Sequence, residues 1–221
     1  MAGVALALFT IIALGAVGIY VLLKSMQNFK PGRNKIQQDL QQIKAELQPW
    51  VADLVPWSKE EMEQLSLRQM NKTVKKGIAT VAKGIFTTIY HEPVIAWMYR
   101  KYLGPKENAL LYARTSNSEF IYRIKNDEVE LVVDNELVGK MGANGILYNN
   151  KGNKQLAQIN KGSEELLLPV SVNERKVGSL TKATGSEKEN PRAFQYLSEM
   201  TKEEEKLFLA ISILEMARKS M

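Results

Sequence analysis

The C-terminal stretch, residues 201–221, constrains the fold of this chain more than any other part of it. Thr201 and Glu204 have the spacing of a capping box, which predicts that a helix begins here. The run 207–217 that follows is apolar on nearly every side when it is wrapped as a helix. At about 11 residues the run is too short to cross a bilayer. We therefore expect a terminal helix that is buried on all sides by the rest of the domain.

The part of the chain before this helix has the pattern of short antiparallel strands. From residue 129 to residue 180, strands of about four to six residues recur roughly every ten residues, separated by turns rich in Asn, Gly and Asp. The pieces VVDNELVGK (132–140) and VSVNERKVGSL (170–180) resemble each other, and each predicts a hairpin with an Asn turn. With the runs before residue 125 there are about a dozen strands, followed by a polar loop at 183–191. This pattern favours a sandwich or barrel, and we expect the strands to wrap around the terminal helix.

The N-terminal stretch predicts a membrane anchor. Residues 1–23 carry no charged side chain, and as a helix they would be about 33 Å long, enough to span a bilayer. A cleaved signal peptide is the alternative, but no Lys or Arg precedes the run, which is also longer than a signal h-region. We expect residues 1–24 to be a transmembrane anchor. Because basic residues follow from Lys24 onward, the positive-inside rule places the N-terminus outside and the main domain in the cytoplasm.

Residues 25–70 are expected to form a helical linker. Apolar residues spaced three and four apart begin near Asn34 and predict an amphipathic helix, which Pro56 ends. A capping box that starts at Ser58 predicts a second, short helix through about Leu67. The apolar face of the first helix has three possible partners: the neighbouring domain, the membrane surface and another protein.

The best candidate for a binding site is a basic hairpin, KTVKKGIATVAKGIF, residues 72–86. Lysines close to a membrane attract anionic lipid headgroups, at about 1 kcal/mol each. The alternative is an ordinary strand edge that lysine protects from unwanted pairing. The predicted lipid-binding residues are Lys72, Lys75, Lys76 and Lys83.

No pattern in the sequence indicates catalysis, a cofactor or a metal. His91 is the only histidine, next to Glu92-Pro93, and we interpret it as a turn or strand-end residue. The chain has no cysteine, and no G-x-S-x-G, H-E-x-x-H or P-loop motif is present. The segment GKMGANG (139–145) lacks the P-loop ending and precedes a strand, so it reads as a turn. The formal net charge of +6 is a mild excess, and we expect no nucleic acid partner.

The meander FIYRIKNDEVELVVDNELVGKMGANGILYNNKGNKQLAQI, the later VNERKVGSL and the terminal EEEKLFLAISILEMA resemble the superfamily of the tubby C-terminal domain and the phospholipid scramblases. The resemblance covers about residues 72–219 and implies a closed barrel of about twelve strands around a central hydrophobic C-terminal helix. Three features depart from the scramblases: no Cys-rich acylated segment is present, the acidic set at 127–136 lacks EF-hand spacing, and the expected anchor is N-terminal. The resemblance therefore implies the barrel more strongly than it implies scramblase activity.

Taken together, the sequence predicts a mainly β, closed antiparallel barrel at residues 71–221, preceded by the anchor and the linker. The expected function is a membrane-anchored, non-catalytic module that binds lipid or a protein on the cytoplasmic face. One alternative is a scaffold or assembly subunit that contacts its partner through residues 34–67, with the amphipathic helix 34–55 as the contact segment. Another is an enzyme with an unrecognised site.

Overall fold

The structure is a computed structural model that describes residues 17, 20, 29, 31–77, 79–162, 166–182 and 192–221. The predicted anchor, residues 1–24, lies outside the described residues except for Val17 and Tyr20, and the predicted polar loop 183–191 lies outside them entirely. Among the helices of the described part, none has the length and apolar character that crossing a membrane requires.

The described elements run in the order helix, helix, strands, helix. The helices are α2 (Arg33–Val51), α3 (Lys59–Gln64) and α4 (Lys202–Lys219). The strands are β1 (Leu65–Lys75), β2 (Thr80–Thr88), β3 (Pro93–Lys101), β4 (Asn108–Arg114), β5 (Glu119–Lys125), β6 (Glu128–Val133), β7 (Glu136–Met141), β8 (Ile146–Asn149), β9 (Gln155–Ile159), β10 (Leu167–Val172), β11 (Arg175–Thr181) and β12 (Phe194–Gln195).

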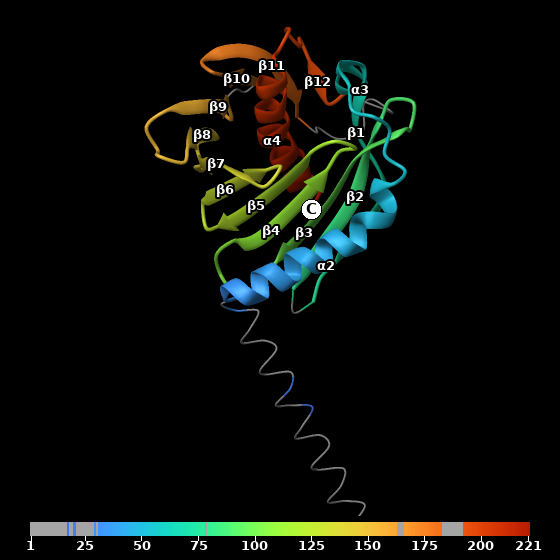
Figure 1. The fold of residues 1–221 in the computed structure, drawn as a ribbon, viewed down its shortest axis with the longest axis vertical. Helices are drawn as coiled ribbons and strands as arrows, with labels where there is room; N and C mark the ends of the chain where they lie inside the picture. Colours follow the sequence, from blue (N-terminus) through green and yellow to red (C-terminus); the bar gives the residue numbers. More distant parts are fainter. Residues whose placement is uncertain are drawn as a thin grey trace, which may run out of the picture.

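The strands form one 12-stranded antiparallel sheet in which every strand pairs with its neighbours in sequence. The sheet curls so that β12 comes back toward β1, as Figure 1 shows. The contact between the edges is narrow: Ser66 of β1 forms a bridge with Arg192, and the backbone N–H of Ala193 donates to the carbonyl of Leu65 at 2.6 Å. The predicted antiparallel barrel of about a dozen strands is thereby confirmed as a nearly closed barrel.

The two similar sequence pieces are both hairpins. Their turns are Asp134-Asn135, with φ of 49° and 67°, and Asn173-Glu174, with φ of 48° and 65°. Positive φ at both central residues is typical of the type I′ turn, whose twist matches that of the flanking strands. Asn and Asp tolerate this conformation better than most residues. These turns confirm the predicted hairpins β6–β7 and β10–β11.

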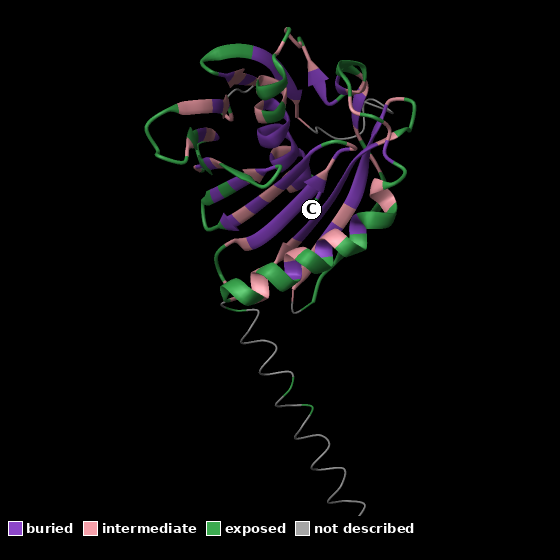
Figure 2. Ribbon diagram, viewed as in Figure 1, coloured by how far each residue is buried: buried purple, intermediate pink, exposed green. Residues whose placement is uncertain are grey.

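Helix α4 lies inside the barrel, with strands around it (Figures 1 and 2). The predicted capping box is present, since Thr201 and Glu204 each accept a hydrogen bond from the other's backbone N–H. The buried residues of α4 are Phe208, Leu209, Ala210, Ile211, Ser212, Ile213, Leu214, Met216 and Ala217. A Cβ on Gly178 of β11 would lie 2.8 Å from Leu197 and 3.3 Å from the ring of Phe208, so this glycine makes room for the segment before α4 and for the helix itself. The terminal helix is therefore enclosed, as its sequence predicts.

Helix α2 lies against the outer surface of the barrel, across β3 and β4 (Figure 1). Ile43 and Leu47 are fully buried there, in a cluster with Met98, Tyr102 and Leu110. The barrel thus covers the apolar face of α2. This is the first of the three possible partners of that face, the neighbouring domain. Only the polar face of the helix remains for contact with another protein.

Two element boundaries differ from the sequence prediction. The second helix, α3, ends at Gln64 rather than near Leu67, and β1 begins at Leu65, inside the segment 25–70 that was expected to be helical linker. The strand starts early because Leu65 and Ser66 are buried at the seam where the barrel nearly closes. The two-residue strand β12 lies beyond the predicted polar loop and was not anticipated.

The alternating turns define two ends of the barrel. The proximal end, named for the start of α2, contains the β1–β2 turn (described at 76, 77 and 79), the turns β3–β4 (102–107) and β5–β6 (126–127), and the C-terminus of α4. The distal end contains the turns β2–β3 (89–92), β4–β5 (115–118), β6–β7 (134–135) and β10–β11 (173–174), together with α3 and the N-terminus of α4. Ion pairs fix the direction of α4: Arg218 contacts Glu107 in the β3–β4 turn, and Lys206 contacts Asp134 in the β6–β7 turn.

Candidate functional site

All four predicted lysines lie on the β1–β2 hairpin, where Lys83 pairs opposite Thr73, but Lys83 differs from the other three in its contacts. Lys72 and Lys75 lie on β1 and Lys76 in the turn that follows; all three are exposed and form no ion pair within the described residues. Lys83, on β2, instead points to α2. Its Nζ is 2.6 Å from Oε1 of Glu46 and 5.0 Å from the ring centre of Trp50. Among the described residues, Lys72, Lys75 and Lys76 are thus the predicted lysines that have no ion-pair partner.

These lysines lie on a part of the β1–β2 hairpin that extends beyond the packed barrel. From Met70 onward every residue of β1 is exposed. A register shift between Met70 and Thr73, with Asn71 at φ 51°, breaks the regular pairing at this point. Lys75 lies opposite Val81, which packs near α2, so its side chain is on the α2 side of the hairpin. Lys76 follows in the turn, next to Lys75 in the chain. The three residues Lys72, Lys75 and Lys76 are called the lysine tip below.

The neighbouring turn adds to the positive charge of the proximal end. Thr80 is paired with Lys101, which places the β1–β2 turn beside the β3–β4 turn. The β3–β4 turn carries Lys106, and its one carboxylate, Glu107, pairs with Arg218 at 3.1 Å. Glu107 also accepts a hydrogen bond of 2.9 Å from the hydroxyl of Tyr99. Burial, and then the charge of Glu107, raise the pKa of Tyr99, so this tyrosine stays protonated. Within the described part of the chain, Lys76 and Lys106 of these two turns have no ion-pair partner, and neither turn shows an unpaired carboxylate.

A buried carboxylate holds the first half of α2 on the barrel. Asp39, only 1% exposed, accepts a hydrogen bond of 3.0 Å from the hydroxyl of Tyr102 and pairs with Arg100 at 2.5 Å. Lys35, one turn earlier on α2, pairs with it at 2.7 Å. Burial, and then the charge of Asp39, raise the pKa of Tyr102. Sequence reasoning did not single out Asp39, although its place between Ile36 and Ile43 on the apolar face was a usable signal.

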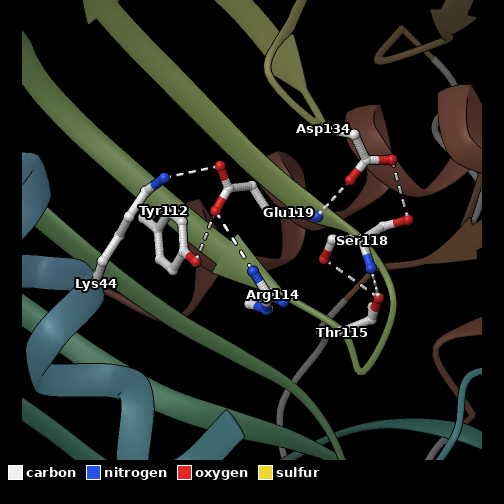
Figure 3. A network of polar contacts seen from close by, with 7 residues as sticks. All are labelled: Lys44, Tyr112, Arg114, Thr115, Ser118, Glu119 and Asp134. Carbon is white, nitrogen blue, oxygen red and sulfur yellow. Dashed lines mark hydrogen bonds and ion pairs between the residues drawn. The ribbon is translucent and has the colours of Figure 1, made fainter.

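A second polar network holds the middle of α2 (Figure 3). Glu119 of β5 pairs with Lys44 of α2 at 2.7 Å and with Arg114 at 3.5 Å, and it accepts the Tyr112 hydroxyl at 3.1 Å. Burial, more than any neighbouring group, raises the pKa of Tyr112 to about 12. The backbone N–H of Glu119 donates to Asp134 at 2.9 Å, which extends the network to the distal end. Each charge in Figure 3 is paired within the protein, so we interpret the network as structural rather than catalytic.

Two hollows lie on the described part of the surface. An open groove of about 880 Å³ lies between the β5–β6 and β7–β8 turns, and its Lys140 is neutralised by Glu128 at 2.7 Å. A smaller pocket of about 250 Å³ lies between α3 and α4, where burial raises the pKa of Glu205. His91 lies exposed in the β2–β3 turn. Among the described residues, no three His, Asp or Glu side chains are grouped so as to hold a metal ion.

Comparison of the chain with protein-family models, with curated proteins and with solved structures finds no match. The candidate site therefore depends on the geometry of this chain alone.

Proposed function

We propose that the protein is a membrane-anchored, non-catalytic module whose proximal end contacts anionic lipid headgroups on the cytoplasmic side of a membrane. Residues 1–24 serve as the anchor, with the N-terminus outside. The single observation that supports this function most is the position of Lys72, Lys75 and Lys76. These exposed lysines lie at the end of the barrel where α2 begins and hence where the chain comes from the proposed anchor.

The energies involved are sufficient for this contact. A lysine close to an anionic surface contributes about 1 kcal/mol, so three lysines contribute about 3 kcal/mol. This attraction acts only within about 10 Å of the surface at ordinary ionic strength. An anchor attached to the same end of the domain satisfies that distance requirement and raises the effective concentration of lipid.

Helix α2 supports the proposal by fixing the direction of the domain. Its apolar face is buried on β3 and β4, and Asp39 and Lys44 connect it to the barrel by ion pairs. A helix attached in this way does not swing like a flexible linker. The lysine tip is therefore held on the side of the domain where α2 starts.

We also propose that the chain is a distant relative of the tubby and scramblase superfamily. The support is the order of the elements, an antiparallel meander followed by an apolar terminal helix. The proposal does not extend to scramblase activity, because the chain has no cysteine for an acylated segment.

The proposed lipid contact is tested by co-sedimentation of a fragment comprising residues 28–221 with vesicles of phosphatidylcholine, with and without phosphatidylserine. We expect binding that grows with phosphatidylserine and falls with salt. Replacing Lys72, Lys75 and Lys76 by Gln should weaken this binding about 100-fold.

The matched control removes the same charge from the distal end, at Lys59, Lys176 and Lys202, which are also exposed. This variant should bind vesicles nearly as well as the unchanged fragment. If both variants lose vesicle binding equally, only the net charge of the protein matters, and the proposed site is wrong. Binding to a protein partner with no response to lipid charge would favour the scaffold alternative instead.

A further inference from the structure

The β3–β4 turn at the proximal end carries an exposed leucine among lysines. Leu103 is 43% exposed and lies between Lys101 and Lys106 in the sequence. A single exposed leucine is common on protein surfaces and by itself indicates nothing. Here, however, the turn lies directly beside the lysine tip, because Thr80 of β2 pairs with Lys101 of β3.

The turn is also held in place rather than left loose. Tyr102, the first residue of the turn, donates a hydrogen bond from its hydroxyl to Asp39 of α2. The backbone N–H of Tyr102 donates to the carbonyl of Asn108 at 2.8 Å. Gly104 follows with a φ of 150°, a conformation that favours glycine. Leu103 therefore projects from a fixed turn at the same end as the lysine tip.

We propose that Leu103 inserts into the acyl boundary of an anionic bilayer while the lysines around it contact the headgroups; this inference rests on the proposed lipid contact. A surface that combines an apolar side chain with lysines matches the layered chemistry of a membrane interface. Lysine stems extend along the apolar layer and keep their ammonium groups at the headgroups. The one carboxylate of the turn, Glu107, is paired with Arg218 and does not repel the surface.

The distal end provides a matched control residue. Leu137, at the start of β7 next to the β6–β7 turn, is 46% exposed, nearly the same as Leu103. It lies beside Glu136 and near Asp134, on the end that the proposal directs away from the membrane.

The experiment uses the full chain, in which a single cysteine can be introduced because the protein has none. Leu103→Cys and Leu137→Cys are each labelled with a polarity-sensitive fluorophore and added to vesicles with or without phosphatidylserine. We expect a blue shift and quenching by spin-labelled lipid at position 103 in anionic vesicles, and no change at position 137.

Two results would overturn the inference. One is an unchanged, water-like emission at position 103 in anionic vesicles. The other is an equal shift at both positions, which would indicate unspecific adsorption. If position 103 stays in water while the lysine substitutions still weaken vesicle binding, the inference fails and the lipid contact stands. If the lysine substitutions have no effect on binding, the proposed function fails independently of the fluorescence.

Discussion

Helices α4 and α2 pack on opposite surfaces of the same sheet, and they do so by different means. Helix α4 lies inside the barrel and is buried along most of its length. Its ion pairs lie toward its two ends, at Glu204, Lys206, Glu215, Arg218 and Lys219. Helix α2 lies outside, buries one stripe and has ion pairs along its length, at Lys35, Asp39, Lys44 and Glu46. The inner helix supplies core to the fold, whereas the outer helix is attached to the finished barrel by ion pairs and one apolar stripe.

The largest effects are expected inside the barrel. Ile211 is 1% exposed and Phe208 fully buried, so replacing either by Ala should lower the free energy of unfolding by about 2–5 kcal/mol. Ile211→Asp should prevent folding, because it buries an unpaired carboxylate in a domain whose total stability is about 5–15 kcal/mol. The measurement is urea unfolding of residues 28–221. If the urea midpoint stays unchanged in both alanine variants, α4 is peripheral, and the contrast between an inner and an outer helix is wrong.

An intermediate effect is expected at the outer helix. Asp39→Ala leaves Arg100 and Tyr102 without their partner and should destabilise the domain by about 1–3 kcal/mol. Asp53→Ala is the control, since Asp53 follows the same helix but is exposed. Urea unfolding again measures the difference. If the two variants unfold at the same urea concentration, α2 is not held by its buried ion pairs.

The smallest effect is expected where α4 meets the distal turns. Burial opposes ionisation of Asp134, but hydrogen bonds from Lys206, Ser118 and the Glu119 backbone outweigh it and lower the pKa of this carboxyl. Asp134→Asn should therefore cost about 0.5–1 kcal/mol at neutral pH, because the pair is largely exposed. Asn also tolerates the positive φ at this position.

The sign of the pH dependence follows from the lowered pKa. The stabilisation by Asp134 is present above the pKa of the unfolded carboxyl, about 3.9, and is lost as pH falls through the lower folded value. The difference between the unchanged fragment and Asp134→Asn, measured by urea unfolding, should shrink below about pH 4. Asp127→Asn, on the exposed β5–β6 turn, is the control, because Asp127 forms no ion pair among the described residues. A constant difference for Asp134→Asn down to low pH would contradict the lowered pKa.

Much of the fold was predictable because its signals are local. The apolar run 207–217 and its capping box predicted a buried helix, and Asn-containing turns predicted the hairpins. Strand β12 was missed because Phe194–Gln195 is too short to show a period. The start of β1 was misplaced because the seam, a contact between distant segments, decides it.

The candidate site was predictable only in part. The grouping of Lys72, Lys75 and Lys76 follows from their spacing on one hairpin tip. The pairing of Lys83 does not, because Glu46 lies 37 positions earlier and reaches it only when α2 docks on the barrel. No sequence pattern distinguishes Leu103. Its position matters because the pairing of β2 with β3 places its turn beside the lysines.

The central claim is that the proximal end faces an anionic membrane. Hydrogen–deuterium exchange of residues 28–221, with and without phosphatidylserine vesicles, tests it over both ends at once. We predict slower exchange in the β1–β2 turn, the β3–β4 turn and the first turn of α2, with no change in the β6–β7 and β10–β11 turns. Protection of the distal turns, or no protection at the proximal end of vesicle-bound protein, would contradict the claim.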